Sequence, residues 1–113
     1  MANERFLKWA AKRYLTEQQY RVRFSRIRLG NFEIDGEATG PNGERIGIEI
    51  KTKRDDICRG IGQLAEAIAF GYQGTVLATT FKRAKRLDRK VFEHFRIQLL
   101  GIDGTGNAHE LAD

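Results

Sequence analysis

The chain has 113 residues, a length that fits one domain over residues 1–113 with one hydrophobic core. Because 41% of the residues are hydrophobic and 31% are charged, the composition excludes a disordered chain, and no apolar run is long enough to cross a membrane. The formal net charge of +5 is equally compatible with a polyanionic partner such as DNA and with a basic protein that has no such partner. The single cysteine, Cys58, excludes an internal disulfide and a cysteine-rich metal site, so we expect an intracellular protein.

The N-terminal segment, residues 3–18, is predicted to form a helix with Asn3 as its N-cap. Its apolar stripe at helical spacing consists of Phe6, Leu7, Ala10, Ala11, Tyr14 and Leu15. Residues 20–29 alternate as a strand does, but the alternation shifts by one residue at Ser25–Arg26, which predicts a bulge or bend. The Gly30–Asn31 pair that follows predicts a tight turn.

Two further strands, 32–39 and 45–53, are predicted on either side of a Gly-Pro-Asn-Gly turn. In the first strand we expect the acidic residues on one face and Ile34 and Ala38 together on the other. If the strands pair about the turn, Asp35 approaches Glu49, and two carboxylates repel unless a proton or a cation lies between them.

A hard divalent cation such as Mg²⁺ would resolve this repulsion, because it takes carboxylate oxygens and keeps some of its waters. Lys51 would then lie beside a metal-bound water or a bound phosphate, as metal-assisted phosphodiester hydrolysis requires. The alternative is a solvent-exposed strand face with cross-strand ion pairs.

The second half of the chain alternates helices and strands. We predict a helix over 55–72 capped by Asp55 or Asp56, a buried strand over 74–80, a helix over 82–95 and a strand over 97–102. The helix over 82–95 should turn Ala84, Leu87, Val91 and Phe95 inward, and residues 101–107 are interpreted as a mobile tail. The element order αβββαβαβ predicts an α/β fold with a mixed central β-sheet flanked by helices.

The arrangement of Asp35 followed by Glu49-Ile50-Lys51 on the next strand resembles the D-(x)n-E-x-K signature of the PD-(D/E)xK nuclease superfamily. That superfamily has an αβββαβ, restriction-endonuclease-like core, and the resemblance covers residues 3–80. It implies a DNA endonuclease that uses Mg²⁺, with Mn²⁺ as a substitute. By position, Asp35, Glu49 and the Ile50 carbonyl would be metal ligands, and Lys51 would position or activate the water.

Two further residues match branches of this superfamily. Glu4 matches the glutamate that archaeal Holliday-junction resolvases place on the first helix, where it completes the site. Gln63 resembles the glutamine of RecB-like nucleases, although Ala67 stands where their tyrosine is expected; the alternative is an ordinary exposed helical residue. The short chain and Glu4 fit a structure-selective, resolvase-like nuclease or a virus- or plasmid-type nuclease. The alternative function is a non-catalytic DNA-binding or assembly protein that kept the fold.

Basic residues flank the candidate site and crowd residues 82–90. They are interpreted either as DNA-phosphate contacts or as a solvated surface. The candidate DNA-binding residues are Arg21, Arg23, Lys53, Arg54, Arg59, Lys82, Arg83, Lys85 and Arg86.

We also expect a homodimer, because cutting both strands of a duplex needs two sites related by a two-fold axis. Trp9, Ala67 and Phe70 lie outside the inward stripes of their helices and are predicted to form a self-complementary patch. The alternative is a monomer in which Trp9 and Phe70 pack under the C-terminal tail.

Overall fold

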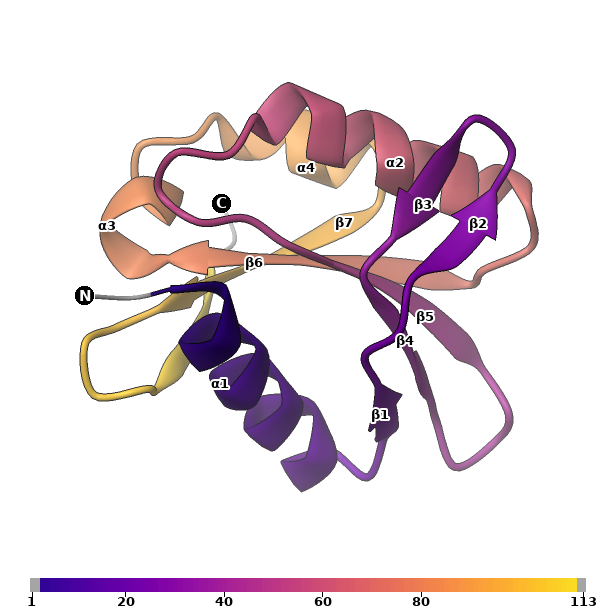
Figure 1. Ribbon diagram of the computed structural model, residues 1–113, viewed down its shortest axis with the longest axis horizontal. Coiled ribbons are helices and arrows are strands. Elements are labelled where there is room, and N and C mark those ends of the chain that lie inside the picture. Colours follow the sequence, from indigo (N-terminus) through magenta and orange to yellow (C-terminus); the bar gives the residue numbers. More distant parts are fainter. Residues whose placement is uncertain (1–2, 112–113) are drawn as a thin grey trace.

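A six-stranded mixed sheet forms the centre of the computed structural model, which describes residues 3–111; helix α1 covers one face, and α2, α3 and α4 cover the other (Figure 1). The helices are α1 (Glu4–Glu17), α2 (Ile57–Ala69), α3 (Phe81–Ala84) and α4 (Arg89–His94). The strands are β1 (Arg21–Arg23), β2 (Ile27–Leu29), β3 (Phe32–Ile34), β4 (Gly36–Thr39), β5 (Arg45–Ile50), β6 (Gly74–Thr80), β7 (Ile97–Ile102) and β8 (Ala108–Leu111).

The strand order in the large sheet is β1-β4-β5-β6-β7-β8. Strands β5, β6 and β7 run parallel to one another, and the other neighbours are antiparallel. Strands β2 and β3 form a separate hairpin. The predicted mixed α/β fold with an αβββαβ core is confirmed. Among residues 3–111, no helix combines the length and the apolar character that a membrane span requires.

Helix α1 follows the sequence prediction closely. The side chain of Asn3 accepts a hydrogen bond from the Phe6 amide at 2.9 Å, which caps the helix. The buried residues of α1 pack against a core that includes Ile48 and Ile50 of β5, so the even-numbered residues of β5 face α1. Glu49 therefore points to the opposite face, toward α2.

Each of the two predicted strands 20–29 and 32–39 is divided in the structure. The chain leaves the large sheet after β1, at the predicted bend near Ser25–Arg26, and returns to it at Asp35, which lies in a bend between β3 and β4. The expectation that Ile34 and Ala38 share a face is wrong. Ile34 belongs to the core beneath α2 and Ala38 to the core beneath α1, because the bend at Asp35 reverses the alternation.

The single helix predicted over 82–95 is wrong, because two short helices occupy this segment. The side chain of Asp88 accepts a hydrogen bond from the Lys90 amide at 3.0 Å and starts a new helix, α4. The new helix has its own phase, so Phe92 is buried, whereas Val91 and Phe95, predicted to point inward, remain 37% and 41% exposed.

The C-terminal segment forms a hairpin, so its interpretation as a mobile tail is wrong. Strand β8 pairs antiparallel with β7. In the turn between them, the Asp103 carboxylate accepts hydrogen bonds from the amides of Thr105 and Asn107, each at 3.0 Å. This hairpin adds β8 as the sixth strand, which forms one edge of the sheet.

Candidate active site

Asp35 and Glu49 lie together, and each acid is held by the backbone of the other's segment. Glu49 Oε1 accepts a hydrogen bond from the Asp35 amide at 2.9 Å. Asp35 Oδ2 accepts one from the Ile50 amide at 2.8 Å. The antiparallel pairing of β4 with β5 creates this arrangement, since it places Gly36 opposite Ile48.

Glu49 is buried away from water, with only 1% of its surface exposed. Burial, followed by the repulsion of the Asp35 carboxylate, raises the pKa of Glu49 to about 8, and the opposing effect of Lys51 is smaller. Without a bound metal ion, Glu49 therefore retains a proton at neutral pH, and a bound metal ion would take the place of that proton.

Lys51 lies beside Glu49 and is also buried, at 8% exposure. Its Nζ is 3.4 Å from Glu49 Oε2 and donates a hydrogen bond to Gln63 Oε1 at 3.3 Å. Its amide donates to the Ala78 carbonyl of β6 at 2.9 Å. The alternative of a solvent-exposed strand face is thus wrong for Glu49 and Lys51.

Gly60 gives the Lys51 side chain its space. A Cβ atom at Gly60 would lie 2.8 Å from Lys51 Cε and 3.1 Å from Leu77 Cδ1. Any other residue at this position of α2 would displace the lysine. The glycine costs helix stability and allows the close approach of α2 to β5 that encloses the site.

Gln63 connects α2 to both segments of the site. Besides accepting from Lys51, its Nε2 donates to the Glu33 carbonyl at 2.6 Å. Gln63 is 8% exposed, so the alternative of an ordinary exposed helical residue is wrong.

The residues fit a hard divalent cation with few protein ligands. Among residues 3–111, no three His, Cys, Asp or Glu side chains gather as a metal site. Mg²⁺ commonly uses one or two carboxylates and completes its shell with water or substrate oxygens, so Asp35 and Glu49 suffice. The Ile50 carbonyl as a further ligand stays a prediction.

The structure does not bring Glu4 into this cluster. Glu4 lies exposed in the first turn of α1, and its carboxylate pairs with Lys8 at 3.5 Å. Helix α1 covers the sheet face opposite to the one from which the Glu49 side chain projects. A role for Glu4 in the site stays a prediction.

Thr79 is a polar residue near the site that the sequence analysis missed. It is fully buried, and among residues 3–111 its hydroxyl has no hydrogen-bond partner. It directly follows Ala78, whose carbonyl accepts from the Lys51 amide. The β-branched composition of residues 74–80 predicts only an ordinary buried strand, so it does not single out the Thr79 hydroxyl.

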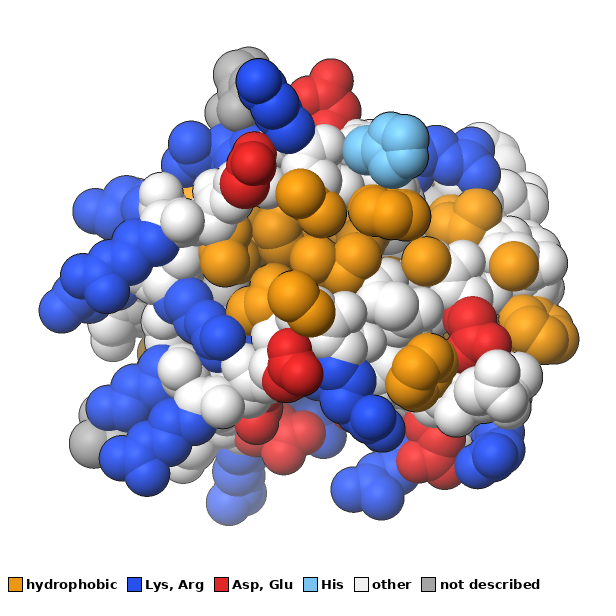
Figure 2. All heavy atoms as spheres, turned by 90° about the horizontal axis from the view of Figure 1, so that it is seen from above, with side chains coloured by type: hydrophobic (Ala, Val, Ile, Leu, Met, Phe, Trp, Pro, Cys, Tyr) orange, Lys and Arg blue, Asp and Glu red, His pale blue; other side chains and the backbone are white. Residues whose placement is uncertain are grey.

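Four of the candidate DNA-binding residues converge beside the site. Lys53, Lys82, Arg83 and Arg86 line a cavity of about 590 Å³. Arg83 Nη1 donates to the Thr52 carbonyl at 2.6 Å, which fixes this cavity next to the end of β5. Figure 2 shows Lys and Arg side chains gathered at the end of the molecule where α3 lies.

The other candidate DNA-binding residues lie outside this cavity. Lys85 and Arg59 are exposed and lie over the aromatic rings of Phe81 and Phe32, and Arg54 is exposed in the loop before α2. Arg21 and Arg23 lie on β1, at the edge of the large sheet.

Glu37, the third acid of the predicted strand face, takes part in a separate ion-pair cluster. It pairs with Arg23 and Arg45, each at 3.1 Å, and accepts from the Tyr72 hydroxyl at 2.7 Å. The Tyr72 hydrogen bond is the main reason that the pKa of Glu37 is lowered. Cross-strand ion pairing therefore describes Glu37 and not the Asp35–Glu49 pair.

The apolar patch expected from Trp9, Ala67 and Phe70 is not assembled. Ala67 is completely buried in the core, whereas Trp9 and Phe70 are 49% and 55% exposed. Helices α1 and α2 lie on opposite faces of the sheet, so Trp9 and Phe70 belong to different surfaces (Figure 1). Trp9 packs beside Phe6, with ring centroids 5.7 Å apart.

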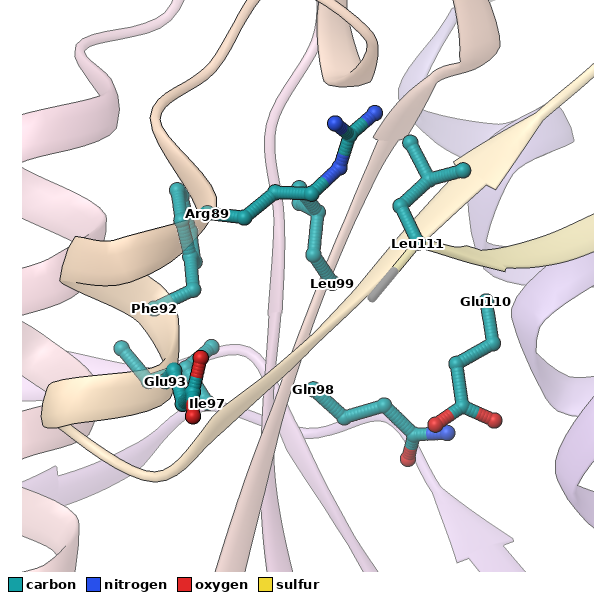
Figure 3. Close-up of a pocket in the computed structure, with 8 residues that line it drawn as sticks. All are labelled: Arg89, Phe92, Glu93, Ile97, Gln98, Leu99, Glu110 and Leu111. Carbon is teal, nitrogen blue, oxygen red and sulfur yellow. The ribbon is translucent and has the colours of Figure 1, made fainter. Parts of the chain in front are cut away.

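A second hollow, of about 270 Å³, lies between α4 and the β7–β8 hairpin (Figure 3). Its lining combines Arg89 and apolar side chains with Glu93, Gln98 and Glu110. None of the residues of the Asp35–Glu49–Lys51 cluster lines it, so it is separate from the candidate site.

Comparisons with known proteins find solved structures with a similar fold. No family model matches the sequence, and no curated protein sequence matches it. A protein of unknown function from Silicibacter pomeroyi superposes with a TM-score of 0.72 at 18% identity, over 99% of this chain and 71% of that one. An XisH family protein from Nostoc punctiforme superposes with a TM-score of 0.61 at 16% identity, over 96% of this chain and 99% of that one.

A repair endonuclease from Pyrococcus abyssi superposes with a TM-score of 0.64 at 10% identity, over 91% of this chain. This chain spans only 48% of that protein. At these identities the similarity establishes the fold alone. The chain therefore has a mixed α/β fold that it shares with solved structures including a repair endonuclease.

Proposed function

We propose that this protein is a metal-dependent DNA endonuclease that hydrolyses phosphodiester bonds with Mg²⁺, for which Mn²⁺ substitutes. The observation that carries the proposal is the cluster of Asp35, Glu49 and Lys51, in which Glu49 and Lys51 are buried. Burying an acid and a lysine together is costly unless they serve a ligand, because both groups lose their hydration. The similarity in fold to an endonuclease supports the same assignment.

Asp35 and Glu49 would hold the cation, and the Ile50 carbonyl is proposed as a further ligand. When bound, Mg²⁺ would supply Lewis-acid chemistry and lower the pKa of a coordinated water. Lys51 would direct its ammonium toward the scissile phosphate and stabilise the negative charge that develops there. Gln63 would orient Lys51, since its amide oxygen accepts from Nζ.

DNA is the proposed substrate, and basic residues from several elements would contact its phosphates without reading the sequence. We propose selectivity for branched DNA, as in Holliday-junction resolvases, and a homodimer that presents two sites. The competing function is a non-catalytic DNA-binding or assembly protein with the same fold.

The decisive experiment incubates linear duplex, branched and single-stranded DNA with the protein, in Mg²⁺ and in EDTA. We expect cleavage only with the metal, and we expect Asp35→Ala and Glu49→Ala to abolish it. Glu17→Ala is the matched control, because Glu17 is an exposed acid on α1. Full activity in Asp35→Ala would refute the site, and DNA binding without cleavage of any substrate would favour the non-catalytic function.

A further inference from the structure

The cavity beside the candidate site, here called the anion pocket, is lined by Lys53, Thr80, Lys82, Arg83, Arg86 and Leu87. Its four cationic residues come from the loop after β5 and from α3 and the residues that follow it. Among residues 3–111, no acidic residue lines the cavity. In the part of the chain from 3 to 111, none of these four cations forms an ion pair with a carboxylate.

Clustered cations without acids repel one another, and a bound anion removes that repulsion. The contrast with Glu37 supports this interpretation, since Arg23 and Arg45 have that carboxylate between them. The anion pocket lacks such an internal counter-ion and therefore favours an external one.

The anion pocket is also fixed relative to the candidate site. Lys53 lies two residues beyond Lys51 in the sequence, and Arg83 binds the intervening Thr52 carbonyl at 2.6 Å. This bond uses one of the five N–H groups of the guanidinium. An anion in the pocket would therefore sit next to the strand end that carries Lys51.

We propose that the anion pocket binds the terminal phosphate monoester of a nucleic-acid strand. A terminal monoester carries close to two negative charges at neutral pH, whereas an internal phosphodiester carries one, so four unneutralised cations favour the terminus. The cavity of about 590 Å³ has the size of a small-molecule site, and Leu87 offers an apolar surface to a sugar or base. The inference rests on the proposed nuclease function and narrows its branched substrates to those that carry a phosphorylated strand terminus, at an end or at a nick.

The test measures the binding of labelled DNA duplexes in EDTA, so that no cleavage intervenes. The duplexes carry a 5′-phosphate, a 3′-phosphate or only hydroxyl ends. We expect one phosphorylated end to bind about tenfold more tightly than the hydroxyl end, the effect of roughly one additional charge-assisted hydrogen bond. The comparison of the 5′- and 3′-phosphates identifies which terminus is recognised.

The double variant Lys82→Gln/Arg86→Gln should abolish this preference, and both residues are exposed, so we expect it to fold. The control Arg5→Gln/Lys12→Gln removes the same charge from exposed positions on α1 and should keep the preference. Equal binding of all ends, or a preference that survives in the double variant, would overturn the inference.

A separate cleavage assay in Mg²⁺ distinguishes failure of this inference from failure of the proposed function. Cleavage without an end preference would refute the anion pocket and leave the nuclease. An end preference in a protein that cleaves no DNA would support the pocket and refute the nuclease.

Discussion

Replacing Glu49 with glutamine tests whether this residue is a buried acid held in a protonated state. In the folded chain without metal, its pKa is raised from 4.5 to about 8. Between these values the unfolded chain has released the proton and the folded chain retains it, so rising pH favours unfolding. One proton corresponds to about 1.4 kcal/mol per pH unit, so the total effect between pH 4.5 and 8 is about 5 kcal/mol.

Glutamine has nearly the same shape and does not titrate. The free energy of unfolding of Glu49→Gln, minus that of the wild type, should therefore grow by about 3 kcal/mol from pH 5.5 to 7.5. Urea unfolding at several pH values in EDTA measures this difference, in which the other titrating groups largely cancel. A difference that stays constant within about 1 kcal/mol over this range would refute the reasoning.

Glu37→Gln provides a control of opposite sign. The hydrogen bond from Tyr72 lowers the pKa of Glu37, so the contribution of Glu37 to stability is present above its unfolded pKa and is lost in acid. The difference in the free energy of unfolding between the wild type and Glu37→Gln should therefore be constant near neutral pH and shrink in acid, as the pH falls below the unfolded pKa of Glu37. Adding Mg²⁺ to the wild type should raise the melting temperature more at pH 8 than at pH 6, because protons compete for Glu49.

Three further predictions concern activity and assembly. Gly60→Ala should displace Lys51 and lower the cleavage rate with little change in stability. Gly62→Ala, whose new Cβ would have its nearest neighbour at 3.9 Å, should raise the free energy of unfolding by about 0.5–1 kcal/mol and keep the rate, and equal rates in the two variants would contradict the packing argument. Lys51→Ala should lower the rate at saturating DNA at least about a hundredfold, the loss typical of one transition-state donor, and a normal rate with weakened binding would make Lys51 only a phosphate anchor. Light scattering should give twice the mass of one chain, and a single-chain mass that DNA leaves unchanged would favour a nicking or end-processing enzyme.

The central architecture was predictable because it rests on local signals. The stripe of α1, its Asn3 cap and the turn at Gly30–Asn31 each follow from neighbouring residues. The approach of Asp35 to Glu49 followed from pairing two strands about one turn. Such features depend on periodicity and turn chemistry, which the sequence displays directly.

The remaining features depend on tertiary context. The burial of Lys51 and Gln63 arises because α2 packs on β5 at Gly60, and charged residues at alternating strand positions otherwise indicate a solvated face. The break before α4 arises because Asp88 caps a new helix, which the run of basic residues conceals. The pairing of β8 depends on the free edge of β7, and local composition does not reveal such an edge.

The interlocked hydrogen bonds of the two acids also have a consequence for the order of folding. They connect residues 14 and 15 positions apart, so a short loop closes them at low entropic cost. The burial of Glu49 requires more, because β6 must pair with β5 across the whole of α2. We therefore expect the acid pair to form early and to lose water late, so the cost of ionising Glu49 should change the unfolding rate and leave the folding rate nearly unchanged.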